Sequence, residues 1–202
     1  MTFEKNSSIP YKVQAAEQFL DATKRIYMQT YDIDPSKESA EDEFLESLSL
    51  MKEYLNDNEY SALHQESKEW SEKFSKDEKL KPAYQNLTHL QSYLRNLANI
   101  DEQITHIETT YVNNSENQIH PSMEDESEDN YNFLGDLETI RGRVNDGEYS
   151  YAAKDARRLK NLYNKHEPET NYVEEIPQSL DTVRKYLNAE QQSETNLTAK
   201  KH

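Results

Sequence analysis

The sequence predicts an all-α protein of two related three-helix units with an extra helix at the N-terminus. Hydrophobic residues make up only 34% of the chain and charged residues 31%, which suits thin helical bundles with one apolar stripe per helix. The chain has only three glycines, a poor supply for the turns of a sandwich, a barrel or a nucleotide-binding α/β sheet. Apolar residues recur instead at steps of three and four, the spacing of one helix face.

The N-terminal unit is predicted over residues 10–114, after a flexible tail at residues 1–9. Its first helix should run from about Pro10 to Tyr31, because a proline in the first helical turn loses no hydrogen bond. Several apolar residues of this segment share one face: Val13, Ala16, Phe19, Leu20, Ile26 and Tyr27.

A second helix is expected between Ser39 and the sequence Asn56-Asp57-Asn58. Ser39 with Asp42 three residues later has the pattern of a helix N-cap, and Asn and Asp tolerate the conformations that close a helix. Ser61 is then the predicted N-cap of a third helix.

One long helix should follow from Pro82, with about thirty residues and apolar side chains at three- or four-residue steps. Residues 115–130 are predicted to be an acidic, flexible linker, since SENQIHPSMEDESEDN contains six acids and no Lys or Arg. The C-terminal helical unit is expected at residues 131–190, followed by a disordered tail at 191–202.

Each unit contains a similar six-residue sequence, NDNEYS at residues 56–61 and NDGEYS at residues 145–150. At the same offset of 89 residues, apolar positions of two successive helices also coincide, for example Phe44 with Phe133 and Leu48 with Leu137, and those of a third helix coincide with one further residue inserted. An internal duplication of a helical unit explains both observations. We therefore assign seven residues of the repeated sequence to structural turns and caps: Asn56, Tyr60, Ser61, Asn145, Gly147, Tyr149 and Ser150.

Fourteen tyrosines are unusual for a chain of this length. Tyr60 and Tyr149 occupy equivalent turn positions, where a packing role is favoured. Tyr151 and Tyr163 remain candidates for a partner surface, because tyrosine rings provide contact area at low entropic cost.

No known catalytic or metal-binding pattern is present in the sequence. The run from Asp32 to Glu43 spaces oxygen ligands as a calcium loop does, but its sixth position is Lys37 where the turn needs glycine. The six histidines form no Glu-x-x-His or His-x-x-x-His pair, and no glycine-rich phosphate loop or nucleophile elbow appears. We therefore predict a protein without enzymatic activity, cofactor or metal.

The net charge of -16 should repel nucleic acids and anionic membranes, so it disfavours direct nucleic-acid binding and favours a basic protein partner. No apolar run is long enough to span a membrane, and MTFEKNSSIP lacks a signal core. These features predict a cytoplasmic protein, or a cell-surface protein if a signal or anchor has been removed.

The segment with Gly147-Glu148-Tyr149, Ala152-Ala153, Leu159 and Glu174-Glu175-Ile176-Pro177 resembles the spectrin-like helical repeats of the bacterial septation-ring regulator EzrA. It is about equally similar to FIVAR modules, the three-helix units of Gram-positive surface proteins. Either resemblance implies a bacterial interaction or scaffolding protein, envelope-associated in the first case, and transfers no catalytic residue. The alternative is an acidic inhibitor of phage or plasmid origin whose carboxylates imitate DNA phosphates.

Overall fold

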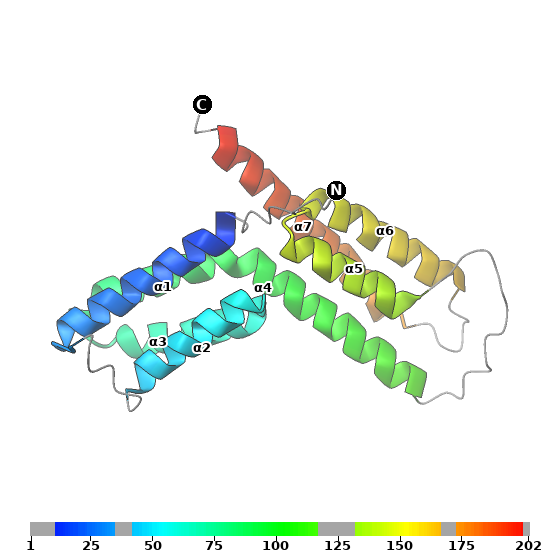
Figure 1. The fold of residues 1–202 in the computed structure, drawn as a ribbon. Coiled ribbons are helices and arrows are strands. Elements are labelled where there is room, and N and C mark those ends of the chain that lie inside the picture. The colour runs from blue at the N-terminus through cyan, green and yellow to red at the C-terminus, as the bar shows by residue number, and fades with distance from the viewer. Residues whose placement is uncertain (1–10, 35–41, 117–131, 167–172, 200–202) are drawn as a thin grey trace, which may run out of the picture. The chain divides into compact units, whose positions relative to one another are not determined.

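The computed structural model describes residues 11–34, 42–116, 132–166 and 173–199 (Figure 1). Of the described residues, 89% are helical and none lies in a strand. The predicted all-α class is therefore confirmed. The predicted N-terminal tail at residues 1–9 lies outside the described residues.

The chain divides into two compact units, residues 1–98 and residues 99–202. The boundary falls inside one continuous helix, α4, which runs from Lys81–Glu116. The sequence predicted a boundary at residues 115–130, where composition changes. Periodicity shows where a helix continues, but not where its apolar face changes from one core to another, so the prediction missed this boundary. Residues 115 and 116 end α4, and the remainder of the predicted linker lies outside the described residues.

Unit 1 contains α1 (Tyr11–Thr30), α2 (Glu43–Asn56), α3 (Tyr60–Phe74), a short 3-10 helix (Glu78–Leu80) and the first part of α4. Its helices meet at a cluster of aromatic rings. Phe44 is 1% exposed, and its ring centroid lies 4.5 Å from that of Tyr27, 4.9 Å from Trp70 and 4.8 Å from Phe74. Aromatic pairs at such distances stabilise a core beyond the area they bury.

Polar contacts fix the neighbouring helices of unit 1. The Asp42 carboxylate caps α2 by accepting from the Phe44 and Leu45 N–H groups over 3.0 and 3.1 Å. The Glu66 carboxylate on α3 accepts from the Ser47 hydroxyl of α2 and from the Trp70 indole. The Glu66 carboxylate thus links α3 to α2 by accepting hydrogen bonds from one neutral donor on each helix.

Unit 2 contains the last part of α4, from residue 99, with α5 (Phe133–Asn145), α6 (Tyr149–His166) and α7 (Glu175–Ala199). Its core also contains a group of aromatic rings. The ring of Phe133 stacks on Tyr111 of α4 at 4.2 Å and lies 5.4 Å from Tyr163 of α6. Aliphatic residues complete the core: Ile100, Ile104, Ile107, Leu137, Ile140, Leu159, Leu180, Val183 and Leu187.

Helix α7 extends beyond residue 190, the predicted end of the C-terminal unit. It begins at Glu175 and reaches Ala199, so residues 191–199 are helical where the sequence predicted a disordered tail. No glycine or proline follows Pro177 in this segment, and Gln, Glu, Ala and Leu have high helix propensity. Residues 200–202 lie outside the described residues.

Candidate functional site

The sequence NDNEYS closes α2 in unit 1. Asn56 is the last residue of the helix, and Asn58 adopts the left-handed conformation with a φ of 61°. The Glu59 N–H donates to the Tyr54 carbonyl over 2.8 Å. This bond across five residues belongs to a Schellman motif, which satisfies carbonyls that a helix end leaves without partners.

The sequence NDGEYS closes α5 of unit 2 with the same geometry. Asn145 is the last residue of the helix, and Gly147 has a φ of 74°. The Glu148 N–H donates to the Arg143 carbonyl over 2.8 Å. Glycine adopts this conformation without steric cost, so both repeated sequences are helix-ending turns.

Ser61 and Ser150 do not act as the predicted N-caps. In unit 1 the N-cap is Glu59, which also ends the Schellman motif, and α3 begins at Tyr60. In unit 2, α6 begins at Tyr149. Each serine is therefore the second residue of its helix, because the turn leads into the next helix two residues earlier than an N-cap at the serine predicts.

The tyrosines at these turns have buried rings. Tyr60 is 2% exposed and Tyr149 is 3% exposed. The Tyr60 hydroxyl donates to Oδ1 of Asn58 over 2.8 Å. Each ring packs inside its unit, as the expected packing role requires, and neither offers a surface to a partner.

Of the two tyrosines predicted to form a partner surface, only Tyr151 lies on the surface. Tyr163 is fully buried, and its hydroxyl accepts a hydrogen bond from the Val173 N–H over 2.9 Å. The prediction for Tyr163 was wrong because this residue follows Ala156 and Leu159 at helical spacing, which places it on the core face of α6. Tyr151 is 55% exposed.

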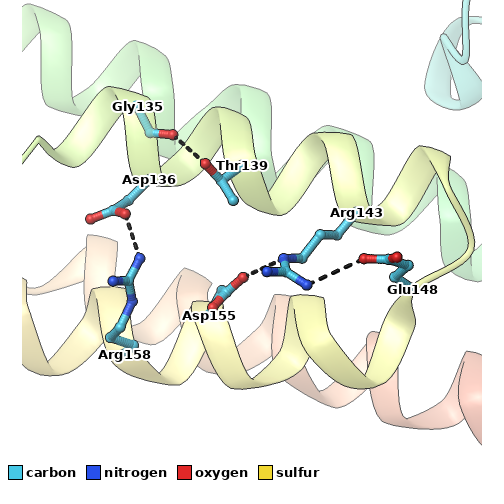
Figure 2. A network of polar contacts seen from close by, with 7 residues as sticks. All are labelled: Gly135, Asp136, Thr139, Arg143, Glu148, Asp155 and Arg158. Atoms are coloured by element: carbon cyan, nitrogen blue, oxygen red, sulfur yellow. Dashed lines mark hydrogen bonds and ion pairs between the residues drawn. The ribbon is translucent and has the colours of Figure 1, made fainter. Parts of the chain in front are cut away.

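Arginine and lysine side chains surround the exposed ring of Tyr151. The guanidinium carbon of Arg143 lies 5.3 Å from the ring centroid, and the ammonium of Lys154 lies 5.2 Å from it. Figure 2 shows how Arg143 is held between α5 and α6: its Nε lies 2.6 Å from Asp155 and its Nη1 lies 3.2 Å from Glu148. The ring and its cations thus form an ordered cation–π cluster.

A groove between α6 and α7 adjoins this cluster through Lys154. It encloses about 580 Å³ and is lined by Ser150, Ala153, Lys154, Arg157, Arg184, Asn188 and Gln191. Three of these residues are cationic, three are polar without charge, and none is a carboxylate. The groove is therefore a positively charged site on an acidic protein.

Helix α6 provides most of this positive charge. It carries five Lys or Arg residues and one acid, whereas α3, at the corresponding place in unit 1, carries two Lys and three Glu. Arg158 pairs with Asp136 over 2.6 Å, and Lys160 pairs with Asp181. Arg157 forms no ion pair with any residue that the structure describes.

The described residues contain no group of three His, Cys, Asp or Glu side chains that could hold a metal ion. Of the calcium-like run, Asp32 has a φ of 52° and Glu43 is the first residue of α2. Residues 35–41 between them lie outside the described residues.

Within the described parts of the chain, no helix is both long enough and apolar enough to cross a membrane. Comparison with protein-family models, with curated proteins and with solved structures finds no match for this chain.

Sequence reasoning selected Tyr151 but missed the groove beside it. The excess of bases on α6 is visible in the sequence, and could have indicated Lys154 and Arg157. Arg184 belongs to α7, some thirty residues later, and only the packing of α7 against α6 brings it to the same groove.

Proposed function

We propose that this protein is a non-enzymatic interaction or scaffolding module made of two copies of one helical unit. The observation that carries the proposal is the recurrence of the same turn and aromatic contacts in each unit. Helix-ending bonds at Glu59 and Glu148 have the same length of 2.8 Å at an offset of 89 residues. Repeated helical units of this kind are typical of proteins that present surfaces to partners.

The aromatic contacts extend the repeat to a fourth segment. Tyr27 of α1 contacts Phe44, and Tyr111 of α4 contacts Phe133. Phe133 is the counterpart of Phe44 at the offset of 89, whereas Tyr111 follows Tyr27 at an offset of 84. The last part of α4 is thus the counterpart of α1, which the sequence treated as an extra helix. A helix that ends one unit and begins the next is the arrangement of spectrin-like rods, and it agrees with the resemblance to the septation-ring regulator.

The charge distribution favours this proposal over a DNA-mimic inhibitor. A phosphate-like surface needs rows of carboxylates without neutralising bases. Here many acids pair with bases, including Asp21 with Lys52 in unit 1 and Asp136 with Arg158 in unit 2.

The test is affinity capture of the tagged full-length chain from the cells that produce it, after mild crosslinking, with identification by mass spectrometry. We expect one or a few proteins in stoichiometric amounts, unaffected by added duplex DNA. The Tyr151→Ala variant is captured in parallel as a matched control, because this change removes an exposed ring and leaves both cores intact.

Two outcomes would contradict the proposal. Recovery of no stoichiometric protein would remove its basis. Capture of a nuclease or repressor that duplex DNA displaces would support the DNA-mimic function instead.

A further inference from the structure

We propose that the groove between α6 and α7 binds an acidic peptide segment of a partner protein through Lys154, Arg157 and Arg184. This inference rests on the proposed interaction function and goes beyond it by naming a surface and the chemistry of its ligand. It also opposes the expectation from net charge, which favours a basic partner.

The groove has the donor set that carboxylates require. Arg157 and Arg184 offer guanidinium groups, which bind carboxylates with two parallel hydrogen bonds, and Lys154 adds a compact ammonium. Ser150, Asn188 and Gln191 can donate further hydrogen bonds to a peptide backbone. Among the described residues that line the groove none is a carboxylate, so the three cations meet no negatively charged acceptor from this lining.

Internal pairing leaves much of this charge available. Neither Arg157 nor Lys154 forms an ion pair with a described residue, and the Lys154 ammonium lies 5.2 Å from the centroid of the Tyr151 ring. Arg184 pairs with Asp181 over 3.3 Å on the same helix, with both side chains about two-fifths exposed. Exposed pairs of this type contribute at most about 1 kcal/mol, so a ligand carboxylate can compete for Arg184.

The positive charge is specific to unit 2. At the offset of 89 residues, Lys154 corresponds to Gln65 and Arg157 to Lys68, and one residue further Arg184 corresponds to the buried Leu94. A surface without a function in binding has no need to concentrate bases on one of two similar units. The difference therefore marks the α6–α7 groove as the site that acquired a ligand.

Electrostatics favours a short acidic segment over a nucleic acid. At physiological salt, charges are screened beyond about 8 Å, so a peptide inside the groove interacts mainly with the three local cations. A nucleic acid or an anionic membrane is much larger than the groove and meets the field of the whole chain, whose net charge is -16.

The test uses fluorescence anisotropy with the full-length chain and a labelled hexa-aspartate peptide. We expect saturable binding, which the double variant Arg157→Glu with Arg184→Glu weakens by about tenfold or more, as loss of charge-assisted hydrogen bonds implies. The matched control, Lys68→Glu with Lys76→Glu, changes the net charge equally on the exposed surface of unit 1. It should change the affinity by less than about twofold, because screening isolates distant surface charges.

Three results would overturn the inference: no binding of hexa-aspartate, an equal loss in both double variants, or tighter groove-dependent binding of a single-stranded oligonucleotide or of phosphatidylserine vesicles. Circular dichroism verifies that each variant is folded, and the milder pair Arg157→Gln with Arg184→Gln serves if charge reversal disturbs α6 or α7. Capture of the partner with the double variant distinguishes the groove proposal from the scaffold proposal. A partner that still binds the Arg157→Glu, Arg184→Glu chain leaves the scaffold function standing and removes the groove as its site.

Discussion

Different interactions hold two helix pairs together. Aromatic packing and neutral hydrogen-bond donors hold α2 to α3 in unit 1, and ion pairs hold α5 to α6 in unit 2. In unit 1, Trp70 and Phe74 of α3 surround Phe44, and Glu66 accepts hydrogen bonds from neutral donors. In unit 2, the counterpart of Trp70 is Leu159, and ion pairs of Arg143 and Arg158 join the helices (Figure 2).

The proposed duplication of one unit accounts for the turn geometry that the two units share. In unit 1 the rings of Phe44, Trp70 and Phe74 pack in the core, and α3 carries mixed charge. In unit 2, α6 carries five bases, of which Arg158 and Lys160 pair with neighbouring helices and Arg157 lies on the surface. We therefore expect mutations in the core to affect unit 1 more, and charge mutations to affect unit 2 more.

The largest expected effect is the loss of a central aromatic ring. Phe44→Ala should lower the free energy of unfolding by about 4 kcal/mol and Phe133→Ala by about 3 kcal/mol. The ring of Phe44 lies 4.5 Å from Tyr27, 4.9 Å from Trp70 and 4.8 Å from Phe74, whereas the ring of Phe133 lies 4.2 Å from Tyr111 and 5.4 Å from Tyr163. Urea denaturation measures both by circular dichroism. The single tryptophan, Trp70 in unit 1, adds a fluorescence signal specific to that unit, and an equal cost of the two changes would contradict the comparison.

The next largest changes in stability are expected at two glycines of unit 2. Gly147 lies in a turn and Gly142 inside α5, and their replacement by alanine should have opposite effects. Gly147→Ala should cost about 1 kcal/mol, because its φ of 74° strains an alanine although no atom lies within 4 Å of the added carbon. Gly142→Ala, inside α5 and equally unobstructed, should stabilise the protein by up to about 1 kcal/mol.

Asn58→Gly in unit 1 is the matched change for this experiment. It should alter stability by only a few tenths of a kcal/mol, since both residues tolerate the left-handed conformation. Thermal unfolding of the three variants gives the order, and a stabilising Gly147→Ala would exclude the strained turn.

A smaller effect is expected at the α5–α6 surface. Arg158→Ala breaks the pair with Asp136 and should cost about 0.5 kcal/mol at low salt, with less at high salt. Its counterpart change in unit 1, Glu69→Ala, is the control. If Glu69→Ala costs as much as Arg158→Ala in the same salt series, the ion pairs do not distinguish the units.

The smallest effect at neutral pH concerns Tyr27. Burial, followed by the nearby Asp42 carboxylate that accepts a hydrogen bond from the hydroxyl, raises the pKa of Tyr27 to about 12. Because the folded pKa lies above the unfolded value of 10.0, this stabilisation is complete below pH 10.0 and is lost as the pH rises through about 12.

Ultraviolet titration of tyrosinate tests this shift. The folded protein should show a late-ionising component that Tyr27→Phe reduces and that Tyr151→Phe, at an exposed ring, leaves in place. A titration curve that Tyr27→Phe does not change above about pH 11 would contradict the assignment of this pKa.

Residue spacing was sufficient to predict most helices, because their apolar stripes are regular. α1 and α4 begin within one residue of the predicted Pro10 and Pro82. Tyr163 shows that the same spacing had to be applied to aromatic residues as well as to aliphatic ones. Ser61 shows that a capping pattern fails where the preceding turn already provides the cap.

The groove could not be predicted, since it depends on side chains from two helices. Lys154 and Arg157 lie on one exposed face of α6, yet nothing in a linear sequence says which residue of α7 will stand opposite them. The unit boundary inside α4 was hidden for a similar reason. Ala98 and Ile100 are both buried in one uninterrupted apolar pattern, and only their neighbours differ.

The continuous helix α4 also has a consequence for cooperativity. If one unit unfolds while the other remains folded, α4 must end near Ala98 and expose carbonyl or amide groups that now bond within the helix. A half-unfolded chain thus carries the free-energy cost of a new, uncapped helix end. That cost opposes intermediates and makes the two units melt closer together than two domains joined by a loop.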